Sequence, residues 1–215
     1  MKSSCIAIVT GGSIGDWAHP YLAEADFRIG ADKGAQYILE HGFKLDQALG
    51  DFDSIDSDVM QDISSSGAIV QTFDAIDKDY TDTELAVRYA LQRQPKRIIL
   101  LGALGTRFDH MLANVHLLKL AMDAGVEAVI EDRYNTIRLH QPGAPMTVKR
   151  SRHKQVSLLP LTSEVHGITL NGFQYPLTNA TLTIGQSLGI SNVLDSSEGT
   201  VQITQGLLLI IESHD

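Results

Sequence analysis

The chain has 215 residues, which is enough for one large domain or two small ones and enough to bury a core. Its hydrophobic content of 43% is typical of a globular protein, and its net charge of -9 argues against nucleic acid or an anionic membrane as partner. The single cysteine, Cys5, excludes an internal disulfide and suits a reducing cytoplasm. No apolar stretch approaches the ~18 residues of a membrane span. We therefore expect a cytoplasmic protein that binds neither nucleic acid nor membrane.

The first part of the chain alternates short apolar runs with helix-like segments. The runs that predict buried strands are 5–9, 27–32, 47–51, 68–73, 97–104 and 126–132. The helix-like segments are 17–24, 34–42, 81–94 and 109–125. Within 81–94, Thr81 and Glu84 have the spacing of a capping box ahead of an apolar stripe. Strands alternating with helices predict an α/β domain with a mainly parallel, doubly wound sheet.

The pattern changes near residue 141, where a Pro- and Gly-rich cluster (141–145) and a basic segment (149–154) follow each other. Beyond them no helical period remains, and turn residues separate short β runs. These runs are 156–161, 166–172, 180–185, 189–194, 199–204 and 206–213. We expect two domains, 1–142 and 143–215, the second an all-β sandwich or barrel. A β domain of this size has a marginal core, so we expect it to pack on the first domain, on a partner subunit or on both.

Glycine-rich and polar segments follow four of the predicted strands, at 11–13, 32–34, 50–54 and 102–107. In an open parallel sheet, ligands bind beyond the carboxyl ends of the strands. The shared position of the four segments is therefore stronger evidence for a ligand-binding site than any one segment alone.

Four aspartates lie close together after the third predicted strand, and no Lys or Arg follows them before Lys78. Asp56 and Asp58 are interpreted as solvent-exposed or helix-capping residues. Asp51 and Asp53 directly follow an apolar run and a glycine, and oxygen ligands without Cys or His favour a hard cation. The spacing does not match a calcium-binding EF-hand loop, so the pattern favours Mg²⁺ held together with substrate phosphates.

A second acidic segment, 78–84, lies at the start of the predicted helix 81–94. Helix capping alone would explain one of its two aspartates, Asp79 and Asp82. Lys78 offers a point charge for a phosphate. Two acidic loops at neighbouring strand ends repel each other without a cation, so together they predict a metal and phosphate site.

The segment 102–110 follows an apolar strand and precedes a helix, a position that favours anion binding at the helix N-terminus. Gly102 lets a phosphate approach the backbone, and Arg107 is able to bind a phosphate through two hydrogen bonds. Asp109 either caps the helix or belongs to the site, and His110 is interpreted as structural. The eight histidines show no HxxH or HExxH spacing, so the sequence predicts no zinc site.

In the β region, Tyr175 is either an ordinary β-sheet aromatic or a side chain that stacks on a flat heterocycle. Ser191 and Asn192 are either turn residues or hydrogen-bond partners for a polar ring. Taken alone, this part of the chain does not identify a ligand.

These segments, in this order along the chain, resemble the thiamine pyrophosphokinases, particularly the bacterial form. The segments that carry the resemblance are ADKGA (31–35), LGDFDS (49–54), KDYTDTELA (78–86), GALGTRFDH (102–110), GFQYPL (172–177) and GISN (189–192). The resemblance implies transfer of a diphosphate from ATP to the hydroxyl group of thiamine, giving thiamine diphosphate and AMP, with Mg²⁺. It also implies a Rossmann-like αβα nucleotide-binding domain, a thiamine-binding β-sandwich domain and a homodimer with shared active sites.

The resemblance also implies roles for individual residues. The metal and phosphate centre would contain Asp51, Asp53, Asp79 and Asp82. Phosphate charge would be neutralised by Lys78 and Arg107. The nucleotide pocket would be lined by Asp32, Lys33, Gly34, Gly102 and Asp109. Thiamine would be bound by Tyr175, Ser191 and Asn192. Some relatives have Trp in place of Tyr175, which keeps a stacking surface, and Gly in place of Lys33, which leaves the contacts of the 31–35 loop open.

Two other functions fit the same residues. A Mg²⁺- or Mn²⁺-dependent phosphohydrolase would use the aspartates to activate water, and Asp109-His110 is similar to the start of the DHH motif of phosphoesterases, although Met111 replaces the second His. A sensor without enzymatic activity would bind a nucleotide or thiamine and use the β domain for regulation.

Overall fold

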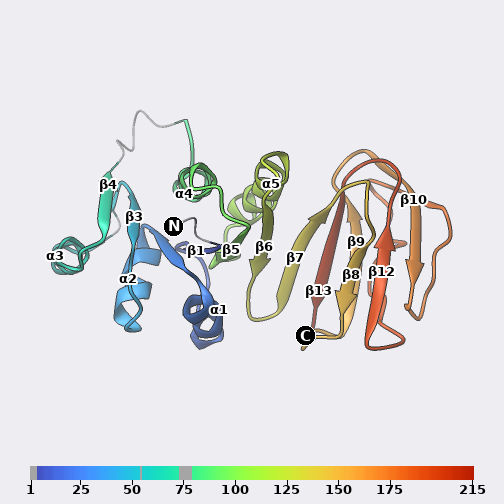
Figure 1. Cartoon of the computed structure of the whole chain (residues 1–215), viewed down its shortest axis with the longest axis horizontal. Helices are drawn as coiled ribbons and strands as arrows, with labels where there is room; N and C mark the ends of the chain where they lie inside the picture. Colours follow the sequence, from blue (N-terminus) through green and yellow to red (C-terminus); the bar gives the residue numbers. More distant parts are fainter. Residues whose placement is uncertain (1–3, 54, 73–78) are drawn as a thin grey trace. The chain divides into compact units, whose positions relative to one another are not determined.

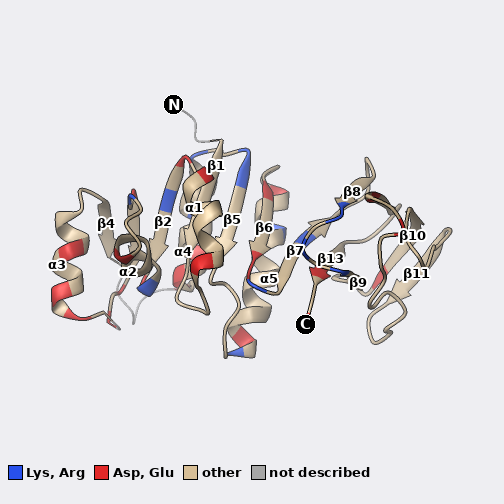
Figure 2. Ribbon diagram, turned by 90° about the horizontal axis from the view of Figure 1, so that it is seen from below, with Lys and Arg blue, Asp and Glu red and all other residues tan. Residues whose placement is uncertain are grey.

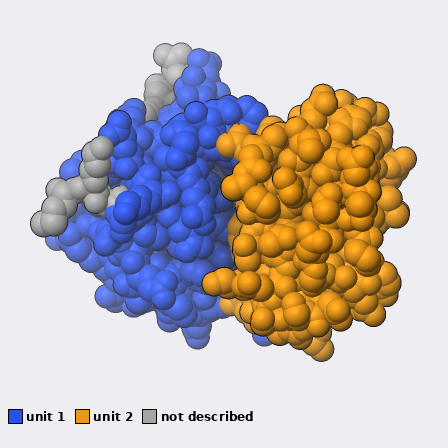
Figure 3. Space-filling model, turned by 45° about the vertical axis from the view of Figure 1, so that its right-hand side comes forward, with its two compact units in different colours: residues 1–133 blue, residues 134–215 orange. Residues whose placement is uncertain are grey.

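Figure 1 shows the computed structural model of the chain, which describes residues 4–53, 55–72 and 79–215. The chain divides into two compact units, Met1–Arg133 and Tyr134–Asp215 (Figure 3). This division falls earlier than the boundary expected at 142/143, because strand β7 (Asn135–His140) pairs with β13 (Leu208–Ser213), at the other end of the second unit. Each unit is described by itself.

The first unit contains six parallel strands in the order β4-β3-β2-β1-β5-β6. In chain order they are β1 (Cys5–Val9), β2 (Phe27–Ala31), β3 (Gln47–Gly50), β4 (Ile69–Thr72), β5 (Arg97–Leu101) and β6 (Glu127–Glu131). The central strands are apolar on both faces, as expected for a parallel sheet that helices cover on both sides. The predicted parallel α/β architecture is confirmed.

The helices form two layers around this sheet. In chain order they are the short 3₁₀ helix η1 (Asp16–Ala18), α1 (His19–Glu24), α2 (Lys33–Glu40), α3 (Ser57–Ser65), α4 (Asp82–Gln92) and α5 (Phe108–Asp123). In Figure 1, α4 and α5 lie on one side of the sheet and α1 and α2 on the other. Leu22 of α1, Ile38 of α2 and Ile63 of α3 share one buried core with Val9 and Leu101 of the sheet.

The second unit contains only antiparallel pairings, in two sheets. One sheet has the order β7-β13-β9 and the other β11-β10-β12-β8. The remaining strands are β8 (Met146–Lys149), β9 (Gln155–Pro160), β10 (Glu164–Asn171), β11 (Ala180–Thr183) and β12 (Glu198–Gln202). Leu158 and Ile210 from the first sheet share a core with Ile168 and Val201 from the second, so the unit is the predicted sandwich.

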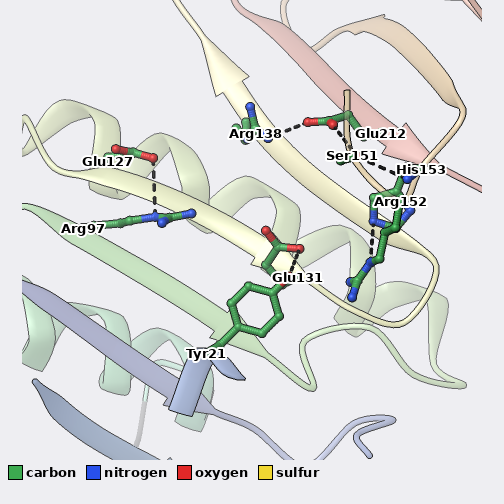
Figure 4. Close-up of polar contacts among 9 residues, drawn as sticks. All are labelled: Tyr21, Arg97, Glu127, Glu131, Arg138, Ser151, Arg152, His153 and Glu212. Atoms are coloured by element: carbon green, nitrogen blue, oxygen red, sulfur yellow. Dashed lines mark hydrogen bonds and ion pairs between the residues drawn. The ribbon is translucent and has the colours of Figure 1, made fainter. Parts of the chain in front are cut away.

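Two buried glutamates accept hydrogen bonds from side chains of their own units (Figure 4). In the first unit, the Tyr21 hydroxyl donates to Glu131 Oε2 over 3.1 Å, and Glu131 is 5% exposed. In the second unit, Arg138 and Ser151 both donate to Glu212, which is 3% exposed. Because a buried charge without partners is costly, these contacts keep the strand ends stable. Among the described residues, no helix has the length and apolar character needed to cross a membrane.

Candidate active site

The order of the strands places a crevice between β1 and β5. From β1 the chain proceeds outward through β2, β3 and β4 on one side, and from β5 to β6 on the other. The helices that follow β1 and β5, α1 and α5, lie on opposite sides of the sheet (Figure 1), and open α/β sheets bind ligands at this switch point.

A pocket of about 260 Å³ lies at this switch point. Loops after β1, β2 and β5 and the N-terminal turns of α4 and α5 line it. Its lining residues are Thr10, Gly11, Gly12, Ala31, Asp32, Thr81, Asp82, Thr83, Gly102, Ala103, Gly105, Thr106, Arg107, His110, Met111 and Asn114. Helix N-termini present unpaired N–H groups, so two of them beside one pocket favour a ligand with several negative charges.

Glycines allow the β1 and β5 loops to run against each other beside the pocket. The Gly12 N–H donates to the Gly102 carbonyl over 2.9 Å, and the Thr10 N–H donates to the Leu101 carbonyl over 2.9 Å. A Cβ on Gly12 would overlap the Gly102 carbonyl, and Gly102 has a φ of 68°. The backbone therefore forms this wall of the pocket, which only glycine permits at both positions.

Asp32 is held in an unusual conformation at the start of α2. Its φ is 48°, in the region that residues other than glycine rarely adopt. Its Oδ1 accepts a hydrogen bond from the Phe52 N–H over 3.4 Å, and a Cβ on Gly50 would overlap the same oxygen. Backbone strain of this kind persists where the surrounding structure enforces it, and it often marks functional sites.

Two carboxyl groups from different elements meet at the pocket. Burial, and then the neighbouring Asp82 carboxylate, raise the pKa of Asp32 to about 7, and Asp51 contributes in the same direction. Carboxylates that share a site without a cation cannot all ionise near neutral pH. A hard divalent cation would remove this repulsion, and the donors present are carboxylate oxygens, the ligand type that Mg²⁺ prefers. The residues therefore fit Mg²⁺.

The other acidic residues predicted for the metal centre are less enclosed. Asp51 is half-buried and its Oδ1 accepts a hydrogen bond from the Asp53 N–H over 3.2 Å, whereas Asp53 and Asp79 are exposed. In the part of the chain that the structure describes, no three of Asp32, Asp51, Asp53, Asp79 and Asp82 bring their carboxylate oxygens within 4.8 Å of one another. Lys78 lies outside the described residues.

Arg107 lines the pocket at the start of α5 and pairs with Asp109 through two hydrogen bonds. The Arg107 Nη2–Asp109 Oδ2 distance is 2.6 Å and the Nε–Oδ1 distance is 3.2 Å. The Arg107 guanidinium lowers the pKa of Asp109 to about 2. Asp109 does not cap α5, since its carboxylate instead orients the guanidinium. The pair is exposed, so a phosphate group can approach Arg107.

In the second unit, Asn192 fixes the loop that carries Tyr175. Asn192 Oδ1 accepts from the Tyr175 and Val193 N–H groups over 3.1 and 2.8 Å, and its Nδ2 donates to the Tyr175 carbonyl over 2.7 Å. Tyr175 itself is 61% exposed. An exposed aromatic ring on a loop held by a buried amide is suited to stacking on a flat ligand.

The chain matches known proteins over nearly its whole length. The family model of the thiamin pyrophosphokinase catalytic domain matches residues 18–130, and that of the thiamin pyrophosphokinase vitamin B1 binding domain matches residues 145–208. Thiamine pyrophosphokinase from Bacillus subtilis is 36% identical over 195 residues, which is 91% of each chain. The chain belongs to the thiamine pyrophosphokinase family.

Solved structures of thiamine pyrophosphokinases share the fold of this family member. The crystal structure of the Bacillus subtilis protein superposes with a TM-score of 0.90 at 35% identity, covering 98% of this chain and 99% of that one. The structure from Geobacillus thermodenitrificans gives a TM-score of 0.88 at 37% identity, covering 98% of each chain. Fold and domain order therefore agree with the family throughout.

The residues that the family resemblance suggested for the nucleotide pocket do not all lie on its wall. Asp32, Gly102 and Arg107 line the pocket. Gly34 instead packs against β1, where a Cβ would overlap the Val9 carbonyl, and Asp109 acts on Arg107.

Sequence reasoning missed several polar residues of the pocket, including Thr10, Thr83 and Asn114. Asn114 is 7% exposed, and its Nδ2 donates to the Ala103 carbonyl over 2.7 Å. The available signal was the position of Asn114 on the buried stripe of the helix, four and seven residues before Leu118 and Ala121, because a buried amide must be hydrogen-bonded.

Proposed function

We propose that this chain transfers a diphosphate group from ATP to the hydroxyl group of thiamine, forming thiamine diphosphate and AMP, with Mg²⁺ as the cation. The observation that carries the proposal is the match to both domains of thiamine pyrophosphokinase, in order, over most of the chain. The pocket at the β1–β5 switch point supports it, because two helix N-termini and a strained acidic residue surround the same space.

In the proposed site, Mg²⁺ binds next to Asp32 and Asp82, which line the pocket from the β2 loop and α4, and Asp51 of the neighbouring β3 loop contributes a further carboxylate. Asp53, Asp79 and Lys78 complete this acidic and phosphate-binding region. When bound, the cation neutralises charge on the diphosphate being transferred. Carboxylates that repel each other in the free protein become a favourable binding site for a cation, which explains why the fold tolerates the strain at Asp32.

The triphosphate lies over the glycine wall formed by the β1 and β5 loops, with Arg107 binding its phosphate oxygens. Asp109 accepts hydrogen bonds from Nε and Nη2 of Arg107 and so orients the guanidinium, whose remaining N–H groups are left for the phosphates. Lys33 and Gly34 support this wall from the start of α2. Phosphoryl-type transfer mainly requires that the phosphates are positioned and that their charge is neutralised. The glycine wall positions the triphosphate, and Arg107 neutralises part of its charge.

Thiamine binds to the second unit by stacking on Tyr175, with Ser191 and Asn192 as partners of its pyrimidine ring. Asn192 uses both polar atoms on the Tyr175 loop but keeps a second N–H on Nδ2 for a ligand. The thiamine hydroxyl oxygen then bonds to the β-phosphorus and gives its proton to a carboxylate of the site, while the bond from that phosphorus to the α-phosphate oxygen breaks, so AMP leaves. The proposal further includes a cytoplasmic homodimer with shared active sites.

The direct test is incubation of the purified chain with thiamine, ATP and Mg²⁺, followed by separation of the products. We expect thiamine diphosphate and AMP in equal amounts. Release of inorganic phosphate without thiamine diphosphate would identify a phosphohydrolase instead. Tight binding of ATP or thiamine by the folded protein, without any turnover, would identify a sensor.

A substitution at Asp51 tests the acidic centre. We expect Asp51→Asn to lower kcat at least about 100-fold, because a carboxylate ligand of the cation that neutralises the phosphate charge is lost. The matched control is Asp56→Asn, since Asp56 lies at the start of α3, is exposed and makes no side-chain capping bond. Circular dichroism checks that both variants fold, and equal activity in the two would contradict the assignment of Asp51.

A further inference from the structure

A second group of potential metal ligands lies on the α1–α2 side of the first unit, and none of its members lines the pocket. Asp16 of η1, His19 at the start of α1 and His41 just after α2 bring one ligand atom each within 4.8 Å of the others. Among the described residues this is the one cluster of three or more His, Cys, Asp or Glu side chains with that spacing.

His19 Nε2 makes no hydrogen bond with any described residue, although this atom is buried. The nearest carboxylate oxygen, Asp16 Oδ1, is 3.8 Å away, which is too far for a hydrogen bond. Buried polar atoms are nearly always paired, so an unpaired one beside a carboxylate and a second imidazole requires an explanation.

His41 is oriented as metal-bound histidines usually are. Its Nδ1 lies 2.9 Å from the Tyr37 carbonyl, which can only accept, so Nδ1 carries the proton and the Nε2 lone pair is available. The His41 ring stacks on the Tyr37 ring with 4.0 Å between centroids. The Tyr37 hydroxyl donates to the Gly15 carbonyl over 2.8 Å, directly before Asp16. One tyrosine therefore fixes both ends of the cluster.

Aromatic packing is the simpler explanation, since His19 also lies 5.4 Å from the Phe43 ring and 5.1 Å from the His41 ring. Packing, however, leaves His19 Nε2 without a partner. Zinc ligands at about 2.0–2.1 Å from the metal lie roughly 3.3 Å apart in a tetrahedral site. The observed Asp16–His19 separation of 3.8 Å needs only a small adjustment to reach that value, and the Asp16 side chain is 91% exposed and free to make it.

We propose that Asp16, His19 and His41 bind a divalent cation of the Zn²⁺, Co²⁺ or Ni²⁺ type, with water completing the coordination. Two imidazoles and one carboxylate favour these metals over Mg²⁺, so the site is chemically different from the acidic pocket. The spacing of the histidines along the sequence did not predict this metal site, because the fold rather than the local sequence brings His41 close to His19. A bound cation links η1 to the end of α2 and holds the end of the loop that carries Gly11 and Gly12.

The test is a titration of the full chain, purified without a histidine tag, with Zn²⁺ and with Co²⁺ in excess Mg²⁺, which occupies oxygen-only sites. We expect calorimetry to give one Zn²⁺ per chain, and Co²⁺ to develop the visible ligand-field absorption of a site with nitrogen ligands. Asp16→Asn and His41→Gln should each weaken binding at least about tenfold. His116→Gln, an exposed histidine of α5, should leave the affinity unchanged.

Zn²⁺ should also raise the Tm of the wild-type chain more than that of Asp16→Asn. Equal Zn²⁺ affinity in the wild type and in both site variants would overturn the proposal, as would the absence of Zn²⁺ binding by the folded wild type. Because Asp16 and His41 are both exposed, neither variant is expected to unfold, and circular dichroism verifies this.

Discussion

At the scale of single residues, the raised pKa of Asp32 makes the stability of the ligand-free chain depend on pH. Its folded-state pKa of about 7 lies above its ordinary value of 3.8, because burial and Asp82 disfavour its charged form. The folded chain therefore binds the proton more tightly than the unfolded chain. The free energy of unfolding contributed by this group is highest below pH 4, falls as the pH rises towards 7 and is level above it.

We expect Asp32→Asn to remove this dependence and to raise the Tm at pH 8 by a few degrees. Asparagine tolerates the positive φ and cannot carry the charge that repels Asp82. The measurement is the difference in Tm between the wild type and the variant from pH 4 to pH 8 without divalent cations, which cancels the titration of the groups that do not interact with Asp32. A difference that does not change with pH would show that Asp32 has an ordinary pKa.

Gly50 has a φ of 150° and leaves room for Asp32, so Gly50→Ala should displace this carboxylate. We expect thiamine diphosphate formation to fall at least about tenfold, since an error of ~1 Å in a catalytic group is costly. Gly42→Ala is the matched control, because Gly42 has a φ of 73° and no atom within 4 Å of an added Cβ. That variant should lose about 1 kcal/mol of stability and keep its activity. Similar loss of activity in both variants would contradict the role assigned to Gly50.

At the scale of elements, α4 depends on a single capping side chain. Thr81 Oγ1 accepts a hydrogen bond from the Glu84 N–H over 3.2 Å, and the next residue, Asp82, faces the pocket. Thr81→Ala should lower the free energy of unfolding by about 1 kcal/mol, whereas Thr81→Ser should preserve it, because serine caps equally well. Urea denaturation of the three proteins measures the difference. Equal loss in both variants would show that the methyl group, rather than the cap, stabilises the helix.

Elements with strong local signals were predictable, and elements fixed by tertiary contacts were not. The apolar runs of β1 and β5 and the capping box of α4 each predicted the element that formed. The helix α3 was not predicted, because most of its segment is polar. It forms by placing a short apolar stripe, Val59, Met60 and Ile63, against the core. The run 189–194 was wrongly predicted as a strand. Residues 189–191 form a turn, in which Ser191 adopts a φ of 59°, and only Asn192 and Leu194 make isolated β-bridges.

The sequence predicted which loops form the candidate site, but it did not predict which side chains of the site contact each other. Glycines and aspartates after apolar strands indicated which loops form the pocket, because strand ends share one edge of the sheet. The contact between Asp32 and Asp82 joins residues far apart in the sequence, and no local pattern encodes it. For the same reason, the pairing of Asn192 with Tyr175 emerged only from the structure.

At the scale of the whole molecule, acidic residues are concentrated in one stretch of a chain with a net charge of -9. Ten of its 26 acidic residues lie between residues 51 and 84, and Figure 2 shows acidic positions along α3 and at the start of α4. Monovalent salt weakens the repulsion among such charges by screening, whereas a cation held at a specific site adds binding free energy. A comparison of a monovalent with a divalent salt therefore separates general screening from binding of a cation at a specific site.

We expect MgCl₂ to raise the Tm more than NaCl does at the same ionic strength. At a concentration of about 100 times the Kd, a specifically bound cation stabilises the fold by about 2.7 kcal/mol. Asp82→Asn should raise the Tm without Mg²⁺, because it removes the repulsion with Asp32, and it should abolish most of the additional effect of Mg²⁺ while keeping the response to NaCl. If NaCl were as effective as MgCl₂ in the wild type, the acidic stretch would act through general screening alone, without a specific cation site.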